Sequence, residues 1–152
     1  MKIKSYKGFT LIELLVVISI IGILAAVATV SYMSAQKQAR DSTRKSDMGQ
    51  YRNALEMYAN KNNGLYVPIT SRRDPSSFLC APLGLTCPGP DDPKYDGVSL
   101  YFYSYITDAA GTQYVLWAKL ENVAATTYWV VCSNGKNGNM VGSSPSDANC
   151  PI

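Results

Sequence analysis

Few residues in this 152-residue sequence could carry out catalysis. The chain contains no His, which excludes nucleophile pairs of Ser or Cys with His and every metal site that needs His ligands. The acidic residues that lie close together are Asp91, Asp92 and Asp96, and they are the one candidate group for an enzyme of carboxylate chemistry. We therefore expect a protein that is not an enzyme and has no cofactor.

The same three Asp residues are candidates for a calcium site, because calcium binds carboxylate and carbonyl oxygens. They lie with Gly97 near a predicted turn, but Lys94 interrupts the pattern of a calcium-binding loop. A solvated turn is the favoured interpretation of Asp91, Asp92 and Asp96, and no other metal site is predicted.

The four cysteines offer either two disulfides or a zinc site. Their spacings, Cys-x6-Cys and Cys-x17-Cys, do not match common zinc sites, so zinc is the less favoured alternative. Four cysteines allow three pairings, and we predict Cys80–Cys87 and Cys132–Cys150 because each pair closes a local loop. Such disulfides indicate an oxidising compartment outside the cytoplasm.

The charge balance argues against a nucleic-acid-binding domain. Three of the 14 Lys and Arg residues lie before Gly8, and the remaining 11 equal the 11 Asp and Glu residues in number. Basic residues cluster only in short pairs such as Arg72-Arg73. No sequence-specific nucleic-acid partner is therefore expected.

One further carboxylate, Glu13, lies at the edge of a long apolar segment. From 11 to 30, 16 of the 20 residues are apolar, and Glu13 is the only charged one. A helix of about 20 apolar residues spans a bilayer, and the basic residues Lys2, Lys4 and Lys7 before it predict a cytoplasmic N-terminus. Because a charge within such a helix is costly, we expect Glu13 to have a partner.

Two plainer interpretations of this segment stay open. The small residues Ala25, Ala26 and Ala28 could mark the cleavage site of a secretory signal peptide. The segment could also be a simple membrane anchor, in which the Glu13 side chain reaches the lipid headgroups. A mature chain that begins after Ala28 would indicate a secreted protein.

A short motif surrounds Glu13, with the sequence Lys7-Gly8-Phe9-Thr10-Leu11-Ile12-Glu13-Leu14. It resembles the class III signal of type IV pilins and pseudopilins, in which a basic leader, a Gly before Phe, a Glu and an apolar helix coincide. The resemblance implies that a prepilin peptidase cuts between Gly8 and Phe9, removes residues 1–8 and methylates the Phe9 amine. It also motivates our hypothesis that Glu13 pairs with the Phe9 amine of a neighbouring subunit during filament assembly.

The helix that carries this motif is expected to extend from Phe9 to about residue 61. Its first half, 9–33, is the apolar membrane and assembly half, and its second half, 34–61, is amphipathic. The second half has an apolar stripe at helical spacing, formed by Met48, Tyr51, Leu55 and Tyr58. Charged residues such as Arg44 are expected on its outer face, and Gly64 is the predicted stop.

Many pilins have a Pro near the position that Val30 occupies in this chain. There a helix can kink or melt during assembly, and Gly22 is the one obvious weak point left in the apolar stretch. Any local melting of this helix is therefore expected near Gly22.

The sequence after the helix predicts a small antiparallel sheet. A connection over 62–97, rich in Pro, Ser and Asp, leads to a sheet within 98–133. Its three predicted strands are β-branched and aromatic runs at 101–107, 113–120 and 127–133. Residues 134–152 are expected to form a C-terminal loop closed by a disulfide. The predicted fold class is α+β, and the resemblance implies the pilin fold, with a long helix wrapped by three or four strands.

The resemblance implies a structural subunit of an extracytoplasmic helical filament. The filament is either a type IV pilus or the pseudopilus of a type II secretion system. Two disulfides and a Cys-closed tail resemble pilins, whereas the stretch from Asp92 to Tyr105 resembles the major secretion pseudopilin, and we favour the pilus. A membrane-anchored or secreted exoenzyme is the more remote alternative.

The resemblance also implies partners and a location. The partners are further copies of this chain, minor pilins, the prepilin peptidase, the assembly platform with its ATPase, and membrane lipid before assembly. The precursor is expected to cross the cytoplasmic membrane once, and the assembled filament to lie on the cell surface or in the periplasm.

Overall fold

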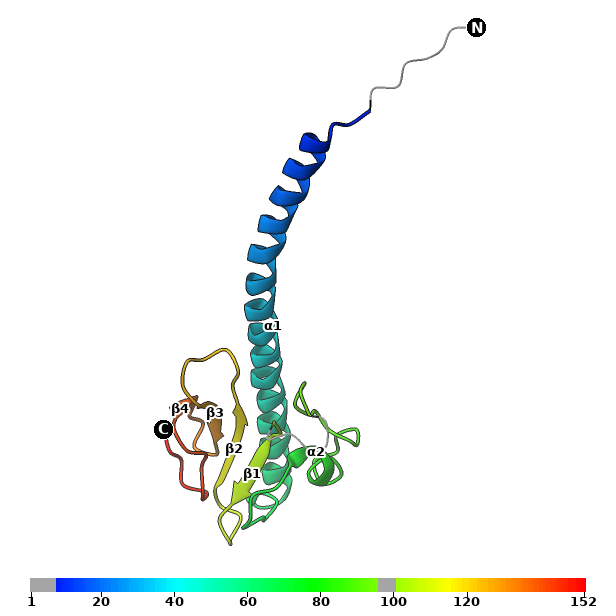
Figure 1. Cartoon of the computed structure of the whole chain (residues 1–152). Helices are drawn as coiled ribbons and strands as arrows, with labels where there is room; N and C mark the ends of the chain where they lie inside the picture. Colours follow the sequence, from blue (N-terminus) through cyan, green and yellow to red (C-terminus); the bar gives the residue numbers. More distant parts are fainter. Residues whose placement is uncertain (1–7, 96–100) are drawn as a thin grey trace, which may run out of the picture. The chain divides into compact units, whose positions relative to one another are not determined.

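The computed structural model describes residues 8–95 and 101–152. The chain divides into two compact units, one up to Gln36 and one from Lys37 to Ile152. Helix α1 contributes to both units, and every strand belongs to the second (Figure 1). The elements are α1 (Leu11–Lys61), α2 (Pro75–Phe78), β1 (Ser104–Thr107), β2 (Tyr114–Lys119), β3 (Thr127–Cys132) and β4 (Asn137–Val141). This arrangement confirms the predicted α+β class.

Helix α1 is 51 residues long and has no interruption at Gly22 or Val30. It contains no Pro, so every backbone N–H beyond the first turn can donate along the helix. It ends where Asn63 and Gly64 take left-handed backbone conformations, with φ of 56° and 79°. The Gly64 N–H donates to the carbonyl of Ala59 at 2.8 Å. Gly64 therefore lies at the helix stop, as predicted.

The four strands form one antiparallel sheet in the order β1-β2-β3-β4. Strands β1, β2 and β3 lie within the three predicted runs, and the predicted antiparallel sheet is confirmed. Strand β1 is the shortest of the three and begins at Ser104, three residues later than predicted. Its free edge pairs with the preceding connection, because Arg73 and Tyr105 exchange backbone hydrogen bonds of 3.1 and 2.9 Å.

Strand β4 lies in the C-terminal segment that we expected to be a loop, and that expectation is wrong over Asn137–Val141. Asn and Gly have low strand propensity, so the composition of this segment does not predict a strand. The backbone forms it nevertheless by pairing with β3, so that Val131 lies opposite Asn137. The signal was Asn134-Gly135, a strong hairpin dipeptide, and Gly135 has φ of 83°.

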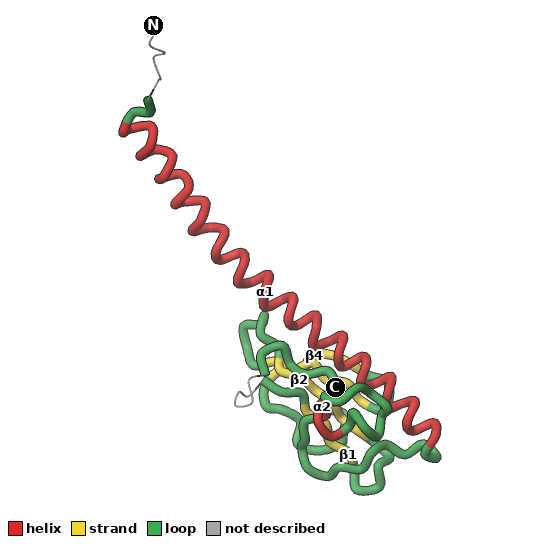
Figure 2. Tube along the Cα trace, turned by 90° about the vertical axis from the view of Figure 1, so that its right-hand side faces the viewer, coloured by secondary structure: helices red, strands yellow, loops and turns green. Residues whose placement is uncertain are grey.

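The main core lies between the second half of α1 and one face of the sheet (Figure 2). Met48, Tyr51 and Leu55 of the predicted stripe are completely buried, and Tyr58 packs against them at the margin. The sheet side chains that meet this stripe are Tyr105, Tyr114, Leu116, Ala118 and Val131. Burial of each large apolar side chain contributes about 1.5–3 kcal/mol, so this contact fixes the sheet on the helix.

The opposite face of the sheet carries a second, smaller cluster. It is formed by Ile106, Val115, Trp117, Val130 and Cys132. Cys150 and Ile152 of the C-terminal segment pack against it. The C-terminal segment therefore covers part of the face that α1 leaves open.

Candidate functional site

The peptide bond that we expect to be cut lies just before α1. Gly8 and Phe9 have no helical structure, and the Phe9 side chain is 88% exposed. A Cβ added at Gly8 would meet no described atom within 4 Å. Within the described part of the chain, both residues are therefore accessible. The other leader residues, 1–7, lie outside the described ranges.

Glu13 caps the N-terminus of α1 together with Thr10. The Thr10 N–H and hydroxyl donate to Glu13 Oε2 at 2.9 and 2.7 Å, and the Glu13 N–H donates to the Thr10 hydroxyl at 3.3 Å. This reciprocal arrangement is a capping box, which satisfies backbone donors that the first helical turn leaves unpaired. The Glu13 carboxylate thus has a partner inside its own chain.

The role of Thr10 was missed at the level of the sequence, although its signal was present. A Thr followed three residues later by Glu, just before an apolar run, is the signature of a capping box. Of the two carboxylate oxygens, only Oε2 accepts a hydrogen bond from the described residues. Oε1 can therefore accept from a second donor while the cap stays in place.

The residues that follow Glu13 in α1 present apolar side chains on all sides. The described large apolar side chains between Leu11 and Met33 are each at least 49% exposed. Among the described residues, α1 is the one helix that is long and apolar enough to cross a membrane. A surface of this kind is stable in lipid or against other apolar helices, and unstable in water.

Both predicted disulfides are present in the structure. Cys80–Cys87 joins the turn after α2 to the following loop with a Cα–Cα distance of 5.3 Å. Cys132–Cys150 joins the end of β3 to the C-terminal segment with a Cα–Cα distance of 5.7 Å. The second disulfide holds Ile152 close to the outer cluster of the sheet.

Asp92 lies neither in a solvated turn nor in a position to bind calcium. Its carboxylate oxygens accept hydrogen bonds of 2.7 Å from Nε and Nη2 of Arg44, and both side chains are buried. Asp91 accepts a backbone hydrogen bond from Asp92, and Asp96 lies outside the described residues. Nowhere in 8–95 or 101–152 do three or more metal-ligating side chains gather around one point.

Arg44 is the centre of a buried ion network, which corrects its expected place on the outer face of the helix. It is 0% exposed and pairs with Asp41 at 2.7 Å and with Glu121 at 2.6 Å, in addition to Asp92. Arg40 donates twice to the same Glu121 carboxylate. The network therefore joins α1 to the loop before β1 and to the loop between β2 and β3.

The ion network shifts the pKa values of Glu121 and Arg44. Burial alone would raise the pKa of Glu121, but hydrogen bonds from Arg40 and Arg44 outweigh burial and lower the pKa to about 2. Burial likewise opposes the charge of Arg44, and the hydrogen bonds to Asp92 and Glu121 nevertheless raise its pKa. Glu121 and Arg44 are therefore both charged at neutral pH, and their ion pair is a structural tie between α1 and the loop that follows β2.

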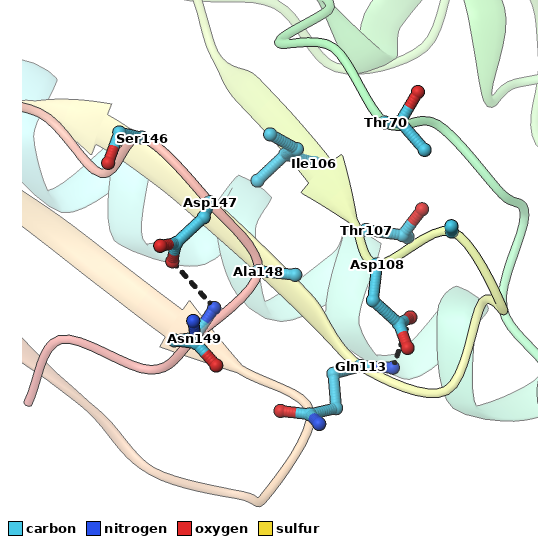
Figure 3. A pocket seen from close by; sticks show the side chains of 10 residues that line it. Thr70, Ile106, Thr107, Asp108, Gln113, Ser146, Asp147, Ala148 and Asn149 are labelled. Carbon is cyan, nitrogen blue, oxygen red and sulfur yellow. Dashed lines mark hydrogen bonds between the residues drawn. The ribbon is translucent and has the colours of Figure 1, made fainter.

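A polar pocket of about 250 Å³ lies at the end of β1, beside the C-terminal segment (Figure 3). Its two carboxylates, Asp108 and Asp147, come from different segments. Asp108 accepts hydrogen bonds from Thr112 and Gln113, which lower its pKa, and Asp147 accepts one from the Asn149 N–H at 2.9 Å. Each acid thus stabilises its own turn.

Comparison with known proteins agrees with the N-terminal features. Residues 3–29 match the family described as the prokaryotic N-terminal methylation motif. The type IV major fimbrial protein FimA of Dichelobacter nodosus is 50% identical over 50 residues, which are 33% of this chain and 32% of that protein. The type IV wide pilus major component PilA4 of Thermus thermophilus is 45% identical over 60 residues, or 40% of this chain and 46% of that protein.

A secretion protein is similar to a comparable extent. The type II secretion system core protein G of Pseudomonas aeruginosa is 43% identical over 58 residues, or 38% of this chain and 41% of that protein. The matches thus span about a third of the fimbrial protein and less than half of the other two relatives. No solved structure matches the chain significantly. This chain carries the N-terminal methylation motif of prokaryotic pilins, and it is similar to type IV pilins and type II secretion pseudopilins.

Proposed function

We propose that this protein is a structural subunit of an extracytoplasmic helical filament, a type IV pilus, that is assembled from the membrane. The observation that carries the proposal is the N-terminal segment, where an exposed Gly8–Phe9 bond precedes a helix with Glu13 in its first turn and apolar side chains on every face. The similarity to FimA and PilA4, which are named as pilus proteins, supports it.

In this proposal the prepilin peptidase cuts between Gly8 and Phe9, removes residues 1–8 and methylates the Phe9 amine. Residues 9–33 then hold the subunit in the cytoplasmic membrane, with a single span and a cytoplasmic N-terminus. The assembly platform and its ATPase move the subunit into a filament of identical chains with minor pilins. In the filament, the apolar side chains of 9–33 contact neighbouring helices instead of lipid. The assembled filament lies on the cell surface or in the periplasm.

Glu13 guides this exchange by pairing with the Phe9 amine of a neighbouring subunit. Its Oε2 keeps the capping bonds to Thr10, and its Oε1 is open to the ammonium. A buried carboxylate without a partner would be costly, whereas a buried pair with further hydrogen bonds is stable. The cap therefore presents the carboxylate in a fixed position before the neighbour arrives.

The processing step is tested by determining the N-terminus of the chain purified from membranes that contain a prepilin peptidase. We expect a chain that begins at Phe9 and carries one methyl group on its amine. A chain that begins after Ala28 would contradict the proposal and indicate a secreted protein.

The pairing step is tested by the filament yield of Glu13 variants. We expect Glu13→Ala and Glu13→Gln to lower the yield about tenfold or more, because the ammonium of the neighbour is left without a charged partner. Thr10→Ala is the matched control, since it removes the hydroxyl bonds of the cap and keeps the carboxylate. If Thr10→Ala lowers the yield as much as Glu13→Ala, capping and not pairing explains the effect.

A second candidate function rests on the similarity to core protein G. In that case the same processing and assembly would build the pseudopilus of a type II secretion system. Deletion of the gene separates the two functions: the pilus proposal expects loss of surface filaments with normal protein secretion. Loss of secretion with intact surface filaments would favour the pseudopilus.

A further inference from the structure

The outer face of the sheet, opposite α1, carries a small hollow of about 100 Å³. The residues that line it come from three strands and from two segments before β1. They are Arg72, Phe102, Ser104, Trp117, Lys119 and Tyr128. The strand register explains why they meet, since Ser104 lies opposite Trp117 and Lys119 lies opposite Tyr128.

Two cations, Arg72 and Lys119, line this hollow. Arg72 donates from Nε to the Ser104 hydroxyl at 3.0 Å and lies over the Phe102 ring at 4.4 Å. Lys119 lies over the Tyr101 ring at 5.3 Å. Within the described ranges, neither cation forms an ion pair, in contrast to the neighbouring Arg40 and Arg44.

One residue of the lining, Trp117, has an unpaired buried donor. Trp117 is 1% exposed, and its indole Nε1 is the one buried side-chain polar atom without a hydrogen-bond partner among the described residues. Buried tyrosines elsewhere have partners: Tyr103 donates to Asp47 and Tyr105 to the carbonyl of Val67. An unpaired buried donor costs about 1–3 kcal/mol, and the Arg72 guanidinium lies over the ring of the same indole at 5.9 Å.

We propose that the hollow between Arg72, Trp117 and Lys119 binds an oxyanion group, a sulfate or a carboxylate. No side chain in the lining carries a carboxylate or an amide oxygen, so the site offers donors and positive charge but few acceptors. The hydrogen bond to Ser104 fixes the guanidinium of Arg72 and leaves its terminal N–H groups for two oxygens of one group. The hollow of about 100 Å³ has room for one such group.

The proposal is tested on the full chain in non-ionic detergent by NMR of the indole N–H. Trp117 and Trp129 are the two tryptophans, so a Trp129→Phe background leaves one indole signal, that of Trp117. Sodium sulfate is titrated against sodium chloride at equal ionic strength. We expect a saturable shift of the Trp117 signal with sulfate and none with chloride, and an equal response to both salts would overturn the proposal.

Variants identify the residues that bind. Arg72→Gln and Lys119→Gln are each expected to weaken the apparent sulfate affinity about tenfold or more, as for the loss of a charged hydrogen-bond donor. Arg73→Gln is the matched control, because it removes the same charge one residue away and does not line the hollow. If Arg73→Gln weakens binding as much as Arg72→Gln, the response is a general charge effect and the proposal fails.

The oxyanion could belong to a free small ion or to an anionic polysaccharide. Further titrations of the same protein distinguish these two sources. Acetate and sulfate represent free ions, and dextran sulfate represents an anionic polymer. An Arg72-dependent shift with the free ions supports a site for small anions, and one with dextran sulfate alone supports a site for anionic polysaccharide. The absence of an Arg72-dependent shift in every arm would overturn the proposal.

Discussion

Arg44 is the central side chain of the ion network in the globular unit, the compact unit from Lys37 to Ile152. It is completely buried and pairs with three carboxylates, those of Asp41, Asp92 and Glu121. We expect Arg44→Ala to lower the free energy of unfolding by about 3–5 kcal/mol, because it leaves buried carboxylates without a cation. Chemical unfolding of the full chain in detergent measures the change.

The control for this variant is Arg40→Ala. Arg40 pairs only with Glu121 among the described carboxylates and keeps 22% of its side chain exposed, so water can replace it. We expect a much smaller loss of stability. Equal losses for Arg40→Ala and Arg44→Ala would mean that burial of the guanidinium is not what makes the network important.

Glu121 makes the same network sensitive to acid. Its pKa is lowered from the ordinary value of 4.5 to about 2, so the folded chain holds its proton less tightly than the unfolded chain does. The stability that Glu121 contributes is therefore complete above about pH 5 and is lost as the pH falls towards 2. The expected result is a difference in unfolding free energy between parent and Glu121→Gln that shrinks across this window. A difference that stays constant with pH would contradict the assignment.

At the scale of the elements, the Cys132–Cys150 disulfide holds the C-terminal segment on the outer face of the sheet. The Cys132→Ser, Cys150→Ser double variant should lose about 3 kcal/mol, as estimated for a loop of this size. It should also expose the cluster around Val130, which Cys150 and Ile152 cover. Thermal unfolding and binding of a hydrophobic dye measure the two effects.

The matched variant removes the other disulfide. The two cysteines of Cys80–Cys87 are separated by 7 positions in the sequence, and those of Cys132–Cys150 by 18 positions. The first disulfide therefore closes the shorter loop. The double variant Cys80→Ser, Cys87→Ser should therefore lose somewhat less stability and leave dye binding unchanged. Increased dye binding in the Cys80→Ser, Cys87→Ser variant would mean that the dye reports an apolar surface other than the cluster around Val130.

The elements that could be predicted from the sequence are those specified by local pattern. The stripe from Met48 to Tyr58 has helical spacing, and the strands up to Cys132 are rich in β-branched and aromatic residues. Strand β4 was not predicted, because it forms by backbone pairing with β3 and not by burial of a regular pattern of apolar side chains. The local signal for this strand is the Asn134-Gly135 turn that precedes it.

The ion network and the hollow could not be predicted, for a different reason. Arg44 looks like a surface residue within its own helix, because its partners Asp92 and Glu121 lie far along the chain. Trp117 and Arg72 likewise meet only after the sheet has formed. A local pattern reports each side chain separately, whereas burial and pairing depend on which distant segments the fold brings together.

At the scale of the whole molecule, the chain from Lys37 to Ile152 should fold without the apolar segment. It keeps both disulfides, the core around Tyr51 and Leu55, and every member of the ion network. We expect this shortened chain to be soluble and folded by circular dichroism and NMR, and unable to form filaments. Failure to fold would show that residues before Lys37 contribute to the globular unit.

A second, shorter chain makes this prediction quantitative. A chain that begins at Lys45 keeps Met48, Tyr51 and Leu55 but loses the network residues of α1, namely Arg40, Asp41 and Arg44. Asp92 and Glu121 then have no buried cation, so we expect this chain to be several kcal/mol less stable than the chain from Lys37. Equal stability would contradict the role of the network. Because both chains keep the whole aromatic core, the difference measures what residues 37–44, with their ionic side chains, add to it.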